Sequence, residues 1–178
     1  MDFIYSIGNS LLIAILSSVI SSIFVILILQ AFLKPKIKIS PVICKKTKED
    51  GRIVYVIKVI NVTGVDIFDI QARLHLVSRE QTFTGEFTKT SEIKLKRSNP
   101  FVISAYGSNR KNYGVFRFLT EEDIEKKWEK DDIQYLRFTI LGKHRRSNTL
   151  GYFEQEYRTK RSSIKEGVFL VGNTFDIK

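Results

Sequence analysis

The chain has 178 residues, about the size of one domain, and its 29 Lys and Arg residues against 19 Asp and Glu give a net charge of +10. An excess of positive charge favours anionic partners, such as phosphate-bearing ligands, nucleic acid or an acidic membrane face. One cysteine, Cys44, excludes an intramolecular disulfide, and one Cys with two distant His residues excludes the usual structural zinc sites, so we expect no metal and no cofactor.

The first part of the chain is strongly apolar. Residues 3–33 contain no charged side chain, and residues 11–29 alone approach the length of about 20 apolar residues that a helix needs to cross a bilayer. The alternative is a secretory signal peptide, which would have a basic segment before the apolar run and a small-residue cleavage site after it. Asp2 is the one charged residue before this run, so the basic segment of a signal peptide is not seen here. The sequence therefore predicts a retained transmembrane helix in residues 1–33 and a folded domain in residues 34–178.

All basic residues lie after this helix, beginning at Lys34. Because Asp2 is the one acidic residue before that point, residues 34–178 carry 29 basic and 18 acidic side chains, a net charge of +11. The positive-inside rule places such a basic flank in the cytoplasm. We therefore expect a single-pass protein of the bacterial inner membrane with a cytoplasmic C-terminal domain and the lipid bilayer as a partner.

Small residues recur on one face of the predicted helix. Ser10, Ala14, Ser17 and Ser21 follow one another at steps of four, three and four residues. Such a face lets helices approach closely and form hydrogen bonds between them, which predicts a homo-oligomer. The alternative is that each serine bonds to a carbonyl of its own helix. Whether an assembled helix would form a pore stays open.

Beyond the helix the pattern changes to short strands separated by Gly, Asn and Ser. One helix is expected in residues 120–130, with Thr120 as its N-cap. Residues 53–61 and 67–77 flank the turn-forming Asn61-Val62-Thr63-Gly64, which predicts a β-hairpin. The expected fold is mainly β: an N-terminal transmembrane helix followed by an immunoglobulin-like antiparallel β-sandwich with one short helix. The expected strands cover residues 35–40, 53–61, 67–77, 85–95, 101–106, 113–118, 133–141, 150–158 and 168–171.

Parts of the C-terminal half resemble a known family. Residues 132–142 (DIQYLRFTILG) and 162–176 (SSIKEGVFLVGNTFD), with shorter segments at 72–77 and 85–87, resemble the cytoplasmic immunoglobulin-like domain of inward-rectifier potassium channels over residues 50–178. The resemblance implies a cytosolic sandwich that assembles around an axis and senses a ligand or lipid beneath a membrane. Those channels need two spanning helices around a filter loop, so this chain, with one span and no Gly-Tyr-Gly sequence, is not a complete channel.

The overall architecture is also similar to that of short bacterial anti-phage membrane effectors. These proteins join hydrophobic N-terminal helices to a small β-domain that receives a nucleotide signal. No specific motif supports this similarity, but the basic charge of residues 34–178 is compatible with a nucleotide ligand.

Two polar turns are candidate ligand sites. Lys143, His144, Arg145 and Arg146 form a cationic hairpin tip, in which arginine can bind a phosphate through two hydrogen bonds and histidine adds a charge that titrates near neutral pH. The second candidate is the turn at 108–112, with Arg110 and Lys111. We expect these residues to contact an anionic lipid or a cyclic nucleotide. The alternative for both is a solvated loop.

The chain contains no Gly-x-Ser-x-Gly elbow, Walker motif or His-Glu-x-x-His sequence, so we predict that it is not an enzyme. The leading interpretation is a membrane sensor or effector whose cytosolic sandwich binds an anionic signal and whose helix oligomerises, with membrane disruption in antiviral defence as its outcome. The alternatives are a passive membrane-anchored adaptor that binds a protein partner, and a regulatory relative of inward-rectifier potassium channels.

Overall fold

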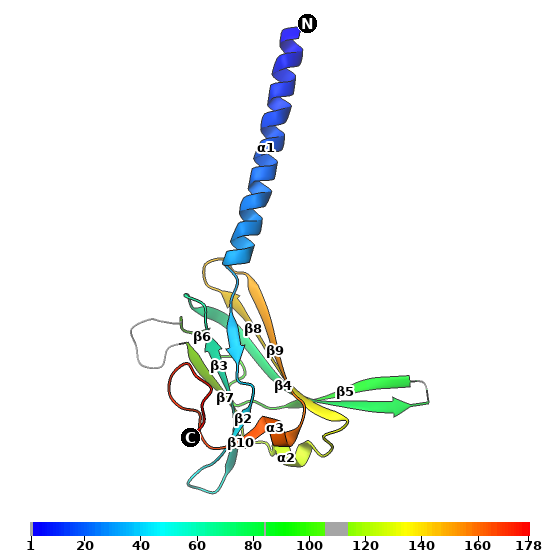
Figure 1. The fold of residues 1–178 in the computed structure, drawn as a ribbon, viewed down its shortest axis with the longest axis vertical. Helices are drawn as coiled ribbons and strands as arrows, with labels where there is room; N and C mark the ends of the chain where they lie inside the picture. The colour runs from blue at the N-terminus through cyan, green and yellow to red at the C-terminus, as the bar shows by residue number, and fades with distance from the viewer. Residues whose placement is uncertain (1, 84, 106–113) are drawn as a thin grey trace.

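The computed structural model describes residues 2–83, 85–105 and 114–178. Helix α1 (Asp2–Phe32) projects from a β-rich domain, and the chain begins at its far end (Figure 1). Its segment Ser10–Gln30 has a mean hydropathy of 2.9, and the side chains of this segment are exposed. The length and composition of this segment suit a membrane span, although a signal sequence near an N-terminus has the same features.

The described residues of the domain form two five-stranded sheets. In the first sheet β3 is central: β7 pairs with one edge, while β1 and β2 pair with successive parts of the other edge. Strand β10 joins this sheet parallel to β2, although an entirely antiparallel sandwich was expected. The strands of this sheet are β1 (Ile37–Ile39), β2 (Ile43–Thr47), β3 (Ile53–Asn61), β7 (Val115–Thr120) and β10 (Ile164–Glu166).

The second sheet has the order β5-β4-β8-β9, and β6 pairs with the start of β4. All its pairings are antiparallel. Its strands are β4 (Ile67–Thr82), β5 (Gly85–Ile93), β6 (Val102–Ile103), β8 (Gln134–His144) and β9 (Leu150–Tyr157). The part of the domain that the structure describes also contains two short helices, α2 (Ile124–Lys127) and α3 (Lys160–Ser163).

The inner faces of both sheets form one hydrophobic core. Ile57 of β3, Leu74 of β4 and Phe138 of β8 all belong to this core, and each is at most 2% exposed. The alternating burial along β8 is the period-two pattern of a strand with one face on a core. Trp128 after α2 is fully buried, and its indole N–H donates to the carbonyl of Gln134 at 3.0 Å. The predicted mainly β fold with an N-terminal helix is therefore confirmed.

The predicted hairpin of residues 53–61 and 67–77 is wrong, because β3 and β4 belong to different sheets. The side-chain amide of Asn61, which is fully buried, donates to the carbonyls of Val65, Ile103 and Ser104 at 2.9, 3.3 and 2.9 Å. These bonds tie the connection to the end of β6, so the chain crosses from one sheet to the other instead of turning back along β3.

The predicted helix over residues 120–130 is also shorter in the structure. Thr120 is the last residue of β7 and pairs with Tyr55 of β3, so it is not the N-cap. Asp123 takes that role, and its side chain accepts a hydrogen bond from the backbone N–H of Lys126 at 3.1 Å. Strands β2 and β10 and the helix α3 were not predicted.

The C-terminal segment after β10 covers the outer face of the first sheet. Phe169 forms an isolated bridge with Ile177 and packs against Cys44, and both Phe169 and Cys44 are buried. The predicted strand at 168–171 is thus part of a small irregular hairpin. Beneath it lies the fully buried Lys58, whose ammonium donates to the carbonyls of Leu170 and Thr174 at 2.8 and 2.6 Å.

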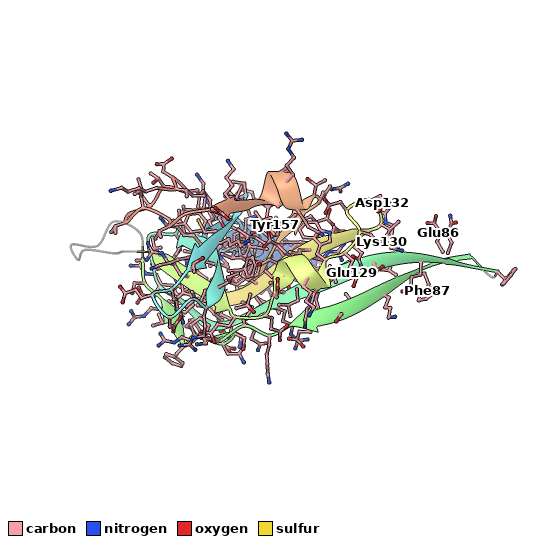
Figure 2. All side chains as sticks on the ribbon, turned by 90° about the horizontal axis from the view of Figure 1, so that it is seen from below. Glu86, Phe87, Glu129, Lys130, Asp132 and Tyr157 are labelled. Atoms are coloured by element: carbon pink, nitrogen blue, oxygen red, sulfur yellow. The ribbon has the colours of Figure 1, made fainter. Side chains whose placement is uncertain are left out.

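The ends of β4 and β5 extend beyond the sandwich as a two-stranded arm, residues 79–82 and 85–88 (Figure 1). Figure 2 shows Glu86 and Phe87 on this arm, away from the packed side chains of the sandwich. Every residue of β5 except Ile93 is exposed, and Phe87 is 45% exposed. Within the described part of the chain β5 pairs only with β4, so its outer edge is open.

Candidate membrane-proximal cationic site

The end of α1 lies directly against the β8–β9 turn (Figure 1). The carbonyl of Leu33, one residue after the helix, accepts a hydrogen bond from the hydroxyl of Ser147 in that turn. The same hydroxyl accepts from the backbone N–H of Thr149 at 3.3 Å. The predicted cationic tip therefore lies at the end of the sandwich where the chain leaves the helix. This end is nearest the membrane if α1 spans one, and we call it the membrane-proximal end.

The linker between α1 and β1 is held on the sandwich. The backbone N–H of Lys36 donates to the hydroxyl of Thr63 at 2.8 Å, and the carbonyl of Lys36 accepts from the backbone N–H of Val62 at 3.0 Å. Pro35 is buried against Gly151 of β9, where a Cβ atom would lie 2.4 Å from the Cγ of Pro35. Only glycine at position 151 has room for this approach, so the linker has a defined path.

Acidic residues neutralise part of the cationic tip. The ammonium of Lys143 lies 2.6 Å from a carboxylate oxygen of Asp69, and the guanidinium of Arg145 lies 2.8 Å from one of Asp66. Arg145 is still exposed, and so is Arg146. Among the described residues, no carboxylate forms an ion pair with Arg146. Arg146 is therefore the tip residue best placed to meet an anion.

His144 does not have the role that the sequence predicted. It is the last residue of β8, 2% exposed, and its Nδ1 lies 3.3 Å from the backbone nitrogen of Ser147. Burial, and then the nearby positive charge of Arg146, lower the pKa of His144 below its usual value. The ring is therefore neutral near pH 7 and adds no charge to the tip.

Two surface hollows with no lining residue in common border the β8–β9 turn. The first, of about 460 Å³, is lined by Arg145 and Arg146 together with residues 64–66 and 105; we call it the arginine hollow. The second, of about 430 Å³, is lined by residues 34–37 of the linker and 149–153 at the start of β9; we call it the linker hollow. Sequence reasoning placed Lys34 and Lys36 beside the membrane but did not find this second hollow.

The other predicted site residues are elsewhere or not described. Arg110 and Lys111 lie outside the described residues. Ser10, Ala14, Ser17 and Ser21 are all exposed on α1. The hydroxyl of Ser17 donates to the carbonyl of Ala14 at 3.0 Å, which is the bonding within one helix that the alternative predicts. A bond of this kind lies within α1 and adds no bulk to its face of small residues, so a second helix could still approach. Helix association stays a prediction.

No group of His, Cys, Asp and Glu side chains suited to a metal ion occurs in residues 2–83, 85–105 and 114–178. Cys44 is buried, and burial raises the pKa of its thiol, which disfavours the reactive thiolate.

Comparison with known proteins gives little further information. No protein-family model and no curated protein sequence matches the chain. Among solved structures, the chain is similar to the crystal structure of Spo0M, a sporulation control protein from Bacillus subtilis, with a TM-score of 0.41 and 12% sequence identity. The similarity covers 70% of this chain and 49% of that one, so the chain spans about half the length of the protein it matches. A likeness this distant supports no functional assignment, and the resemblance to inward-rectifier channels stays a prediction.

Proposed function

We propose that this protein is a single-pass sensor or effector of the bacterial inner membrane, with its β-sandwich in the cytoplasm. In this proposal the sandwich binds an anionic signal at its membrane-proximal end, and the helix oligomerises. The observation that carries the proposal is the contact between Ser147 and Leu33, because it joins the cationic turn to the exit of the apolar helix. A ligand that moves this turn would act directly on the helix end.

The charge of the membrane-proximal end suits this role. Lys34, Lys36 and Arg146 are exposed, and none of them forms an ion pair with a described residue. Each lysine or arginine near an anionic leaflet contributes about 1 kcal/mol, so these three would contribute about 3 kcal/mol to surface attachment. That energy orients a domain already anchored by its helix. Membrane disruption in antiviral defence would follow if ligand binding promoted assembly through the serine face of α1.

The orientation is tested by a reporter fused after Lys178. We expect a reporter that functions only in the cytoplasm to be active, since the basic flank begins at Lys34. Activity of a periplasmic reporter alone would overturn the cytosolic placement and the intracellular ligand with it.

The ligand is tested by calorimetric titration of the full chain in detergent with a panel of cyclic dinucleotides. Replacing Arg145 and Arg146 by Glu should abolish binding, and raising the salt concentration should weaken it, because exposed charges are screened over about 8 Å at physiological ionic strength. Arg73→Glu is the matched control, since Arg73 is an exposed arginine of β4 outside the arginine hollow. Equal binding by both variants would show that the cationic tip is not the ligand site.

Helix association is tested by replacing Ser10, Ser17 and Ser21 together with Leu. We expect a smaller oligomer in native mass spectrometry, because the bulk of leucine prevents close helix approach and removes hydrogen bonds worth about 0.6 kcal/mol each. An unchanged oligomer would mean that the serine face does not mediate assembly.

The β4–β5 arm favours a second function, the adaptor. The open edge of β5 exposes backbone N–H and C=O groups that an extended segment of a partner protein can pair with. Thr88→Pro in β5 would remove a donor from this arm and should reduce capture of such a partner, while leaving dinucleotide binding unchanged. If partner capture is unaffected by this change, the arm is not the adaptor surface.

A further inference from the structure

We infer that the linker hollow is a binding site for the headgroup and glycerol region of an anionic phospholipid. This inference deepens the proposed function and rests on its single-pass topology. Neither the cationic tip nor the arginine hollow is needed for it, because the linker hollow shares no lining residue with either of them.

The hollow begins where the apolar helix ends. α1 ends at Phe32, and Lys34 and Lys36 follow within four residues. If α1 spans the bilayer, this stretch lies at the level of the lipid headgroups, because the headgroup region borders the hydrocarbon core. A phospholipid can therefore place its phosphate in the hollow without leaving the leaflet.

The two walls of the hollow have different chemistry. Lys34 and Lys36 on the linker are exposed, and neither forms an ion pair with a described residue, so both ammonium groups are available to a phosphate. The β9 wall presents Leu150 and Tyr152, which are 57% and 59% exposed. Tyrosine is enriched at membrane interfaces because its ring is apolar and its hydroxyl is polar. The hydroxyl of Tyr152 donates to Glu154 at 2.5 Å, and the ring stays exposed.

The lysines are held on a fixed scaffold and not on a free tether. The backbone of Lys36 is fixed because its N–H donates to the hydroxyl of Thr63 and its carbonyl accepts from the backbone N–H of Val62. Pro35, between the two lysines, is buried against Gly151. Ile37 then begins β1 in register with Asn61 of β3. A site whose backbone is already ordered loses less entropy when it binds, which favours a specific lipid over a diffuse ionic contact.

The same lysines would attract free phosphate, but the apolar wall distinguishes the two ligands. Inorganic phosphate has no group to cover Leu150 and Tyr152, whereas the glycerol and first acyl carbons of a phospholipid do. In the arginine hollow the apolar side chains are the smaller Val65 and Ala105, beside the Asp66 carboxylate and two arginines, so it offers less apolar surface to acyl carbons. We therefore assign the lipid to the linker hollow.

The test is native mass spectrometry of the full chain in detergent, titrated with phosphatidylglycerol or phosphatidylcholine. We expect the wild-type protein to retain one phosphatidylglycerol per chain and to prefer it over phosphatidylcholine. Lys34→Gln with Lys36→Gln should weaken phosphatidylglycerol binding about 30-fold, the loss of two lysine contacts with an anionic headgroup. Lys38→Gln is the matched control, since Lys38 is an exposed lysine of β1 that does not line the hollow.

A second pair of variants tests the apolar wall. Leu150→Ser with Tyr152→Ser should also weaken phosphatidylglycerol binding, while calorimetry with inorganic phosphate should show no site in the wild type. Phosphate binding that depends on the lysines but not on Leu150 and Tyr152 would overturn the lipid assignment in favour of a free anion. Lipid retention that is the same in the lysine pair and in the Lys38 control would overturn the site altogether.

The outcome is separable from that of the proposed function. In detergent, where there is no leaflet surface for Arg146 to attract, Arg145→Glu with Arg146→Glu should leave phosphatidylglycerol retention in the linker hollow unchanged, because both residues line the arginine hollow. The reporter after Lys178 tests the topology by itself. A cytoplasmic reporter without lipid retention would reject this inference alone, and a periplasmic reporter would reject the proposed topology whatever the lipid titration shows.

Discussion

Replacing Asn61 by Ala should destabilise the domain strongly, because this side chain is fully buried and holds the crossing between the two sheets. Its amide donates to the carbonyls of Val65 and Ser104 at 2.9 Å each, and its carbonyl oxygen accepts from the backbone N–H of Thr63 at 2.8 Å. A hydrogen bond of this kind contributes about 1 kcal/mol net, so the loss of three predicts about 3 kcal/mol. Thr63 also holds the linker at Lys36, so the variant should loosen the membrane-proximal end.

The loss can be measured by thermal unfolding of the full chain in detergent. Trp128, the one tryptophan of the sequence, is fully buried, so its fluorescence reports the unfolding of the sandwich. For a domain of this size 1 kcal/mol corresponds to about 2 to 4 °C, which predicts a Tm lower by about 6 to 12 °C. Gln71→Ala, at an exposed position of β4, should change stability by less than about 0.5 kcal/mol. A fall of less than about 2 °C in the Asn61 variant would refute the assigned role of its amide.

Three further predictions concern pH and packing. Hydrogen bonds from two lysine ammonium groups lower the pKa of Glu121 to about 2, below its value in the unfolded chain. The ionised carboxylate therefore stabilises the fold fully above about pH 4.3, and this stabilisation is lost as the pH falls towards 2. Glu121→Gln should flatten the dependence of Tm on pH in that window. Burial lowers the pKa of His144, so as the pH drops the unfolded chain binds a proton at this residue more readily than the folded chain does. Stability should therefore fall below about pH 6.5. His144→Asn should remove this dependence in the same melting series. Gly142→Ala would place a Cβ atom 2.6 Å from the Cγ2 of Ile67 and should cost about 1 to 3 kcal/mol, whereas Gly64→Ala has open space and should cost less in the same unfolding assay.

Several elements follow from the sequence because their signals are local. The uncharged run of residues 3–33 determined the long apolar helix, since no other element tolerates that length without charge. The β-branched run of residues 53–61 forms β3 with the predicted bounds. The exposure of Arg145 and Arg146 also followed from the sequence, because a charged run between two strands forms a solvated turn.

Other features depend on residues far apart in the chain. Asn61 to Gly64 reads locally as a hairpin turn, and only the bonds of Asn61 to Ile103 and Ser104 decide that the chain crosses between sheets. The short strand β10 pairs with β2 although about 120 residues separate them. Because this pairing depends on distant residues, no local pattern marks either strand clearly. His144 looks like a loop residue in the sequence, and its burial depends on its place at the end of β8, opposite Ile67 of β4.

The sequence by itself determined that an apolar helix precedes a basic β-rich domain and that positive charge follows the helix. Only the tertiary structure decided where that charge lies relative to the rest of the domain. Lys34 and Lys36 line one hollow with Leu150 and Tyr152 because Gly151 lets the linker lie against β9 and because Ser147 donates to the carbonyl of Leu33. These contacts join residues more than 100 positions apart, and the interaction of such distant residues is set by packing rather than by local conformational preference.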